Sequence, residues 1–570
     1  MARRPAVARR LAQLESLRHA FGPSAAARKQ ALLAELGPAR MPGPRAIERL
    51  HEALCWMRAY PDDPALLARV ERLLEGFADR RDLRAARAAL ADSGIAGTEI
   101  RYPFFAATAE CLAQRWPDRL RIDWDALPAS MAEDERLDRL LQPVSHYAET
   151  MGLDEVPLAA RQWLARLRGA GTDATYLLRG LRATGANGFV REYLWERLGL
   201  DLVLAPANGR PSRTRARHAP SPTNFHTAPL RAGRPDVRAA LAARPRAVRA
   251  VPVAEGRALV DLAREAMVTR SRDLDVFAYG DSRDVRLVDW GEGLQFAVIG
   301  FRPERRLMLE TVYGALTLQS GVPIGYVLCA AFLDSVETAY NIFETYRGGE
   351  AAHVYGRVLA TARRLFGADT FTVMPYQLGD GNDEAIDSGA WWFYQKLGFR
   401  PKEPATLALM QRELAAMKRN AKHRSSKATL RGLARECVYW HAGRPRRDVI
   451  GLVDIGNIGL HVTDLLARRA GGDRVAAGRE CGREAAALLG AGSLRGWSAD
   501  ERMWFTRWAP LVLALPGVGR WSARERRELL AVIRAKGGRR ESGFAPLFAR
   551  HRRLRAGVLA LARRGLRRTP

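Results

Sequence analysis

Hydrophobic residues recur at helical spacing over roughly the first 200 residues. Leu11, Leu14 and Leu17 follow this spacing, and so do Ile47, Leu50 and Leu54 further along the chain. Breaks fall at proline and glycine pairs such as Gly22-Pro23. We therefore predict that residues 1–203 form a helical N-terminal domain with short connections, of the bundle or solenoid type.

Residues 204–244 show no hydrophobic period. The segment is rich in arginine and is punctuated by proline at Pro206, Pro211, Pro220, Pro222, Pro229 and Pro235. Such a composition predicts either a solvated linker or an irregular strap laid over the surface. A basic strap could also hold a polyanion.

Residues 245–403 read as a mixed α/β domain. β-Branched and apolar runs predict strands at 247–252, 285–288, 294–299, 307–318, 324–330, 336–346 and 370–376. The 307–318 and 324–330 runs would form a hairpin through Ser320-Gly321. Amphipathic helices are expected at 253–267, at 349–366 and from Ala390 to Leu397, where Gly398 ends the helix.

Helical patterns return over residues 404–570. Ser498 precedes Glu501 by three residues, and Ser522 precedes Glu525 in the same way, which is typical of helix starts. The predicted fold class is thus α+β and multidomain, with a central mixed α/β domain between all-α regions.

The stretch Ala390-Trp-Trp-Phe-Tyr-Gln-Lys-Leu-Gly-Phe399 resembles the last signature block of the GNAT superfamily of N-acetyltransferases. The order of predicted elements is also similar to that fold, in which a strand and helices precede three antiparallel strands, the cofactor helix, a strand, the last helix and a closing strand. The resemblance covers residues 245–403, about a quarter of the chain. On this comparison, residues 272–306 would be an insertion.

The resemblance implies a coenzyme A site at Tyr346-Arg347-Gly348-Gly349-Glu350-Ala351-Ala352. A helix N-terminus with glycines and an arginine can bind a diphosphate. The family pattern assigns this role to Arg347, Gly348, Gly349, Ala351 and Ala352. Glu350 stands where the family has glycine, and its charge would repel a diphosphate unless the side chain points away. Without the resemblance, the same residues describe a helix start with a first-turn glutamate.

The resemblance also assigns three polar residues. Tyr394 matches the family tyrosine that protonates the departing thiolate, although a core aromatic would occupy the same position. Asp387 stands at the position of a family asparagine and is expected near the cofactor. Glu337 and Glu344 share one predicted strand on opposite faces, and we favour Glu344 as the general base. A surface carboxylate is the alternative for either.

Charge adds a second line of inference. The net charge is +29, and arginine is used far more than lysine, as in GC-rich bacterial genomes. The charge is uneven, because residues 403–570 carry about +21 while residues 251–402 carry about −4. This asymmetry predicts nucleic acid or another polyanion as a partner of the basic flanks. A protein acceptor also fits. Leu515-Pro-Gly-Val-Gly519 resembles a helix-hairpin-helix DNA-binding turn, or it is simply a helix end followed by a helix start.

Other classes of function find no support in the sequence. The five cysteines are scattered, with no Cys-x-x-Cys spacing, so we expect no disulfide framework and no metal site. No apolar run reaches the roughly 18 residues of a membrane span, and we expect a cytoplasmic protein.

These patterns lead to one favoured function and one alternative. The favoured function is a GNAT-like transfer of an acetyl or acyl group from coenzyme A, with acetyl-CoA or acyl-CoA as cofactor, to an amine. The alternative is a GNAT-like fold without catalysis, whose basic helical regions bind nucleic acid or a protein partner.

Overall fold

A large mixed sheet lies at the centre of the chain. The computed structural model describes residues 3–127 and 135–564. Within these residues the sheet has nine strands in the order β11-β12-β10-β9-β8-β7-β6-β5-β4. Their bounds are β4 Ala247–Ala250, β5 Gly280–Gly291, β6 Leu294–Phe301, β7 Thr311–Gln319, β8 Val322–Phe332, β9 Ser335–Ile342, β10 Thr370–Val373, β11 Arg400–Pro401 and β12 Val438–His441. Every neighbouring pair is antiparallel except β9 and β10.

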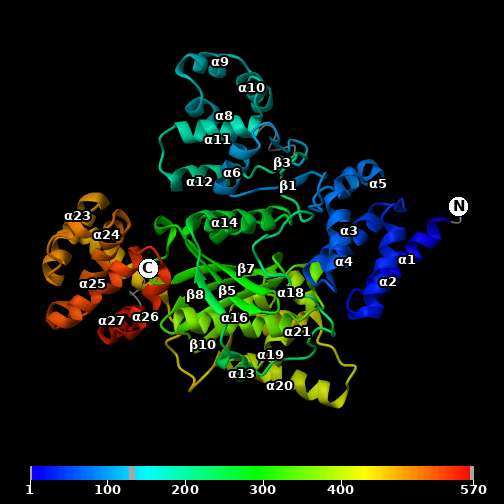
Figure 1. Cartoon of the computed structure of the whole chain (residues 1–570). Coiled ribbons are helices and arrows are strands. Elements are labelled where there is room, and N and C mark those ends of the chain that lie inside the picture. The colour runs from blue at the N-terminus through cyan, green and yellow to red at the C-terminus, as the bar shows by residue number, and fades with distance from the viewer. Residues whose placement is uncertain (1–2, 128–134, 565–570) are drawn as a thin grey trace.

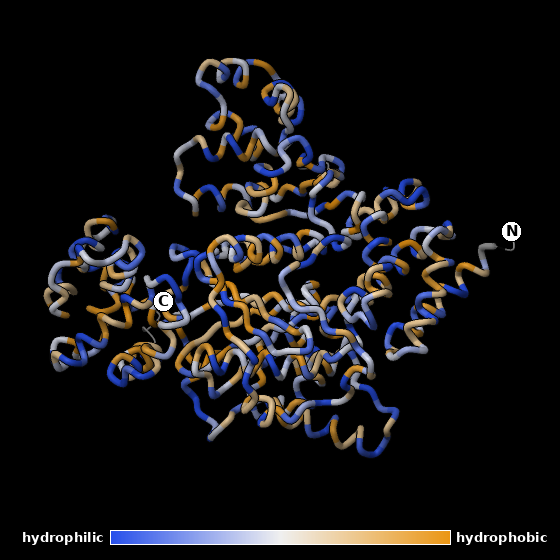
Figure 2. Tube along the Cα trace, viewed as in Figure 1, coloured by the Kyte–Doolittle hydropathy of each residue, from blue (hydrophilic) through white to orange (hydrophobic). Residues whose placement is uncertain are grey.

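Both faces of the sheet are covered because successive residues point to opposite sides. Leu287 and Ile299 pack with α14 (Val253–Val268) and α15 (Asp275–Ala278), whereas Val288 and Val298 pack with the helices of the other face. Those helices are α13 Val237–Ala242, α16 Ala351–Phe366, α19 Ala390–Lys396, α20 Pro404–Arg419 and α21 Lys427–Ala434. Figure 1 shows α14 and α16 on the two sides of the strands. Figure 2 shows hydrophobic residues concentrated along the central strands.

The first helices pack on the central sheet instead of forming a core of their own. Leu54, Trp56 and Tyr60 share one buried cluster with Leu259 and Ile342. These helices are α1 Arg3–Leu17, α2 Pro23–Leu36, α3 Pro44–Ala59, α4 Pro64–Glu75 and α5 Arg81–Ala85.

Residues 100–204 form a separate lobe with its own core. Its helices surround a small three-stranded sheet in the order β1-β3-β2, with strands Ile100–Tyr102, Leu202–Leu204 and Leu120–Ile122. The helices are α6 Ala106–Arg115, α8 Glu135–Val144, α9 Thr150–Glu155, α10 Ala160–Leu167, α11 Asp173–Ala183 and α12 Gly188–Leu198. The prediction of a single helical domain over residues 1–203 is therefore wrong, because these residues form two units and include three strands. Strands of three residues are too short to show a hydrophobic period in the sequence.

Residues 205–236 contain no helix or strand and lie against the protein as a strap. Arg58 donates to the carbonyl oxygens of Thr214 at 2.6 Å and Arg213 at 3.0 Å. Arg210 is buried and donates to the carbonyl oxygen of Leu204 at 2.8 Å. These bonds distinguish the strap from the solvated linker that the composition also allowed.

The central sheet does not end at residue 403, where the sequence placed a boundary. β12 lies between β10 and β11 and pairs antiparallel with both, so residues 404–441 belong to the central unit. The last helices then form a further core: α22 Ile455–Ala470, α23 Arg474–Leu489, α24 Ala499–Ala514, α25 Ala523–Gly537, α26 Phe544–Arg550 and α27 Arg552–Arg563. The C-terminal region is therefore not all-α from residue 404.

Two further expectations concern particular segments. Residues 272–306, an insertion on the comparison above, form α15 and the strands β5 and β6, which lie in the sheet between β4 and β7. The turn after Leu515 joins α24 to α25, with Gly517 at φ 67° and a capping box formed by Ser522 and Glu525, and both interpretations of this turn describe such a geometry. The multidomain α+β class is confirmed.

Candidate active site between two diverging strands

The two parallel strands of the sheet separate soon after they meet. Residues 335–337 of β9 pair with residues 370–372 of β10, and no later pair joins these strands in the described chain. β10 ends because Pro375 cannot donate to a ladder and instead begins the short helix α17 (Pro375–Leu378). The following residues of β9, as far as Ile342, therefore face a gap.

A cavity of about 220 Å³ occupies this gap. It is lined by β9, by the start of α16 and by the helices α18 (Asp383–Ser388) and α19, through Tyr340, Asn341, Arg347, Ala351, Glu384 and Tyr394. The volume lies below the usual range for a whole ligand, so the cavity suits the arm of a longer molecule.

Asn341 lines this cavity and carries an unused hydrogen-bond acceptor. Its Oδ1 atom is buried and has no partner among the described residues. A buried acceptor without a partner costs free energy, so such a group in a cavity wall is a natural contact for a donor on a ligand.

Tyr394 closes the far side of the gap. It is 3% exposed and packs edge-to-face against Tyr355 and Phe399. Burial raises the pKa of Tyr394 above its ordinary value, while a backbone hydrogen bond from Tyr340 acts in the opposite direction. The phenol is therefore protonated at neutral pH.

The residues at the start of α16 lie in two places, some in the cavity wall and others against the N-terminal helices. Arg347 and Ala351 line the cavity. Gly348, at φ 87°, faces His19, because a Cβ atom at this position would lie 3.9 Å from the His19 ring. A Cβ atom at Gly349 would lie 3.4 Å from the side chains of Trp56 and Tyr60. Three of the five predicted cofactor residues of this loop, Gly348, Gly349 and Ala352, are thus outside the cavity wall.

Glu350 does not face the cavity. Its Oε1 atom accepts the backbone N–H of Arg231, in the strap, at 2.9 Å. The side chain makes no capping bond to α16, so the first-turn amides of this helix have no side-chain acceptor. The charge that we expected to repel a diphosphate is turned toward the strap.

Glu384 joins this cavity to a larger one. Its carboxylate accepts from Arg272 at 3.3 Å and also from Arg347. Burial alone would raise the pKa of Glu384, but the two arginines outweigh it and hold the pKa below its ordinary value. Arg347 and Glu384 line both cavities, so their ion pair lies at the junction.

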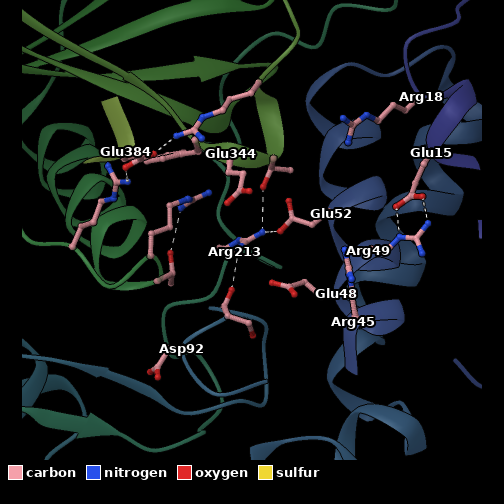
Figure 3. A pocket seen from close by; sticks show the side chains of 17 residues that line it. Glu15, Arg18, Arg45, Glu48, Arg49, Glu52, Asp92, Arg213, Glu344 and Glu384 are labelled. Carbon is pink, nitrogen blue, oxygen red and sulfur yellow. Dashed lines mark hydrogen bonds and ion pairs between the residues drawn. The ribbon is translucent and has the colours of Figure 1, made fainter. Parts of the chain in front are cut away.

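The larger cavity, which we call the polar cleft, has a volume of about 810 Å³. It lies between α1 and α3 on one side and the central domain on the other (Figure 3). Its charged residues are Glu15, Arg18, Arg45, Glu48, Arg49, Glu52, Asp92, Arg213, Arg270, Arg272, Glu344, Arg347 and Glu384. A wall of this kind suits a polar ligand.

The predicted general base lies in the polar cleft instead of on a strand. β9 ends at Ile342, and Glu344 begins a short 3₁₀ turn, where its side chain is exposed. Glu337 is on β9, and burial followed by the charge of Glu310 raises its pKa to about 7. It is four residues from Asn341, or about 13 Å along the strand. Glu344 is therefore the carboxylate closer to the junction of the two cavities.

Asp387 lies outside the cavity. It is on α18 and pairs with Lys427 at 2.5 Å, with both side chains more than half exposed. The neighbouring residues Ala385 and Ser388 line the cavity instead.

Sequence reasoning missed Asn341 and Glu384. Asparagine is depleted in strands, and this was a usable signal for Asn341 on β9. Glu384 gave none, because its partner Arg272 is more than 100 residues away in the chain.

Known proteins offer no identification of this chain, and two other kinds of site have no support in the described residues. No protein family, curated protein or solved structure matches the chain. In the described parts of the chain, no group of three or more His, Cys, Asp or Glu side chains is placed to hold a metal ion. Among those same residues, no helix has both the length and the apolar character that crossing a membrane requires.

Proposed function

We propose that the central domain is a GNAT-like N-acyltransferase that takes an acetyl or acyl group from coenzyme A. The observation that carries this proposal is the gap between β9 and β10, which places the N-terminus of α16, the free Asn341 oxygen and the buried Tyr394 phenol around one cavity. The order of strands and helices from β4 to β11 supports it, with two more antiparallel strands than the resemblance implied.

Each part of the cavity has a role in this proposal. The α16 N-terminus and Arg347 bind the cofactor diphosphate. Asn341 accepts a hydrogen bond from an amide of the cofactor arm, which the unpaired edge of β9 also contacts.

The transfer itself uses the groups at the end of the arm. The amine nitrogen attacks the thioester carbonyl carbon, so a C–N bond forms and the C–S bond breaks. The amine loses a proton to Glu344, through water where needed, and the thiolate takes a proton from Tyr394. The tyrosine recovers its proton from solvent.

Calorimetry with acetyl-CoA tests the proposal. We expect saturable binding in the micromolar range, and competition by free coenzyme A. A protein that binds neither at high micromolar concentration would rule the transferase out.

A second function is favoured by a separate observation. Trp56 and Tyr60 cover Gly349, and Glu384 already neutralises Arg347, so the diphosphate site is partly filled by the protein itself. A chain that has lost catalysis would instead use its basic helices to bind nucleic acid or a protein partner. Exposed arginines on α23 without an ion pair to any described residue, Arg474, Arg479 and Arg483, supply such a surface.

A further inference from the structure

Some charged side chains of the polar cleft pair with one another, whereas others of both signs stay unpaired. The pairs are Arg49 with Glu15, Arg213 with Glu52, and both Arg272 and Arg347 with Glu384. Among the described residues, Arg18, Arg45 and Arg270 have no carboxylate within ion-pair distance, and Glu48 and Glu344 have no cation. A cleft that needed only internal neutralisation would pair these groups.

Arg270 is the most constrained of the unpaired cations. Its guanidinium lies 3.7 Å from the centroid of the Phe343 ring and donates only to the Ala266 carbonyl oxygen at 2.9 Å and the Thr269 hydroxyl at 3.3 Å. Burial, followed by the charge of Arg213, lowers the pKa of Arg270 to about 9. A largely desolvated guanidinium beside another cation is a strong site for an oxyanion.

Glu344 supplies the opposite charge at the same end of the cleft. It follows Phe343, on which Arg270 stacks, and its side chain is exposed to the cleft. Figure 3 shows Glu344 and Glu52 near Arg213, beside the space between the helices and the central domain. Glu344 can therefore attract an ammonium group without losing an existing partner.

We propose that the polar cleft is the acceptor site and that it selects small amines that also carry an oxyanion group, either a carboxylate or a phosphate. The oxyanion binds Arg270, and the ammonium lies beside Glu344, near the junction with the cofactor cavity. This proposal rests on the proposed transferase activity. The volume of about 810 Å³ lies within the range of small-molecule sites.

Matched pairs of amines test this selection. Release of the coenzyme A thiol from acetyl-CoA is measured with glycine against glycinamide, and with phosphoethanolamine against ethanolamine. We expect kcat/KM to be at least tenfold higher for an amine with the oxyanion than for its matched amine. The two pairs separate a carboxylate from a phosphate as the preferred group. Equal or better turnover of the matched amines would overturn the proposal.

Two variants connect the selection to the named residues. Glu344→Gln is at an exposed position, so folding is preserved. It should raise the KM for the amine about tenfold and lower kcat, because Glu344 is also the proposed base, without changing the KM for acetyl-CoA. Arg270→Lys should reduce the difference between glycine and glycinamide. Glu480→Gln, at an exposed position on α23, is the matched control and should change neither constant.

A binding arm separates failure of this proposal from failure of the transferase. Calorimetry titrates glycine and phosphoethanolamine into the protein, with and without coenzyme A. If acetyl-CoA does not bind but one of these amines binds and Arg270→Lys weakens it, the cleft assignment holds and the transferase fails. If acetyl-CoA binds but no oxyanion-bearing amine binds or reacts, the cleft assignment fails alone.

Discussion

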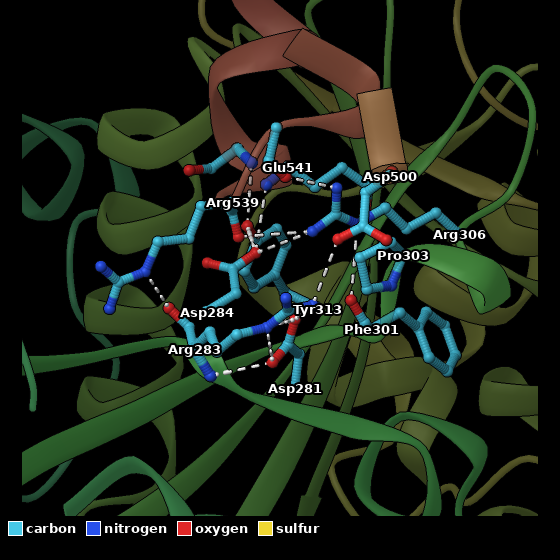
Figure 4. Close-up of polar contacts among 12 residues, drawn as sticks. Asp281, Arg283, Asp284, Phe301, Pro303, Arg306, Tyr313, Asp500, Arg539 and Glu541 are labelled. Atoms are coloured by element: carbon cyan, nitrogen blue, oxygen red, sulfur yellow. Dashed lines mark hydrogen bonds and ion pairs between the residues drawn. The ribbon is translucent and has the colours of Figure 1, made fainter. Parts of the chain in front are cut away.

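Lys536 and Glu541 form an ion pair in which neither side chain has any solvent exposure. Arg306 and Asp284 are equally buried beside them, and Tyr313 donates to Asp284 at 2.5 Å (Figure 4). This buried cluster connects α25 and the following loop to the central sheet. The C-terminal helices are therefore held on the sheet by charges with no access to water.

Removing one member of this pair should strongly destabilise the protein. Lys536→Met leaves the carboxylates of Glu541 and Asp284 with Arg306 as their only buried cation, at a cost of about 3–5 kcal/mol. Urea unfolding followed by tryptophan fluorescence measures the change. Arg524→Met, which removes an exposed pair with Glu528 on the same helix, should have no measurable effect. Equal stability of the two variants would contradict the role of the buried pair.

The partly buried carboxyl of Glu337 should make stability fall as pH rises. Its pKa is raised from 4.5 to about 7 in the folded protein, so between these values the folded state holds the proton more tightly than the unfolded chain. The contribution of Glu337 to the free energy of unfolding therefore falls between pH 4.5 and about pH 7, by at most about 3 kcal/mol.

The Glu337→Gln variant isolates this contribution. Other groups titrate as well, so the measured quantity is the difference between wild type and variant in urea unfolding at pH 5 and pH 7.5. We expect the wild type to lose more stability than the variant over this interval. Parallel losses would show that Glu337 titrates as it does in the unfolded chain.

Tyr394→Phe tests the proposed proton donor. The substitution keeps the aromatic packing and removes only the hydroxyl, so binding of acetyl-CoA should be unchanged while kcat falls about 10²–10⁴-fold. Tyr193→Phe, at an exposed position on α12, should leave both unchanged. A Tyr394→Phe protein with full turnover would leave the phenol as a packing group alone.

Glu384→Gln should strengthen cofactor binding. The carboxylate competes with a diphosphate for Arg347, so its removal is expected to lower the Kd for coenzyme A about tenfold in calorimetry, equivalent to about 1.4 kcal/mol. Asp387→Asn is the matched control, because that exposed carboxylate pairs with Lys427 outside the cavity. Weaker binding by Glu384→Gln would indicate that the pair supports the site rather than blocks it.

The basic C-terminal helices should bind polyanions if the second function holds. Replacement of Arg474, Arg479 and Arg483 by glutamate should weaken the binding of tRNA or duplex DNA, measured by gel mobility shift. Binding by the wild type should fall steeply between 50 and 200 mM salt. Binding that depends on neither change would leave genome composition as the source of the charge.

Periodicity predicted the long elements well and short pairings poorly. The helix at 349–366 and the hairpin turning at Ser320-Gly321 follow from local patterns, and both are present as α16 and as β7 with β8. β12 was not predicted, because four residues between helices carry no period and the strand is stabilised only by β10 and β11. The place where β9 ends also escaped prediction, since Phe343 and Tyr346 extend its apolar pattern but pack with Trp56 of α3.

For the site, sequence reasoning pointed to residues of local motifs and missed those brought in from elsewhere. Arg347, Ala351 and Tyr394 line one cavity, and their roles there stay predictions. Asp387 does not, because α18 turns its neighbours Ala385 and Ser388 inward instead. The polar cleft could not be foreseen, as its walls come from α1 and α3 and from a turn after Ile342, segments that no local pattern connects.

The insertion of β12 between β10 and β11 means that the order of segments in space is not their order in the chain. A polypeptide cut after residue 403 would expose the hydrogen-bonding edge of β10 and the ring of Phe371, which packs against Trp440 in the whole chain. Strand edges of that kind promote self-association. Synthesis must therefore pass residue 441 before the centre of the protein can close, and any recombinant piece intended to fold alone should extend past that strand.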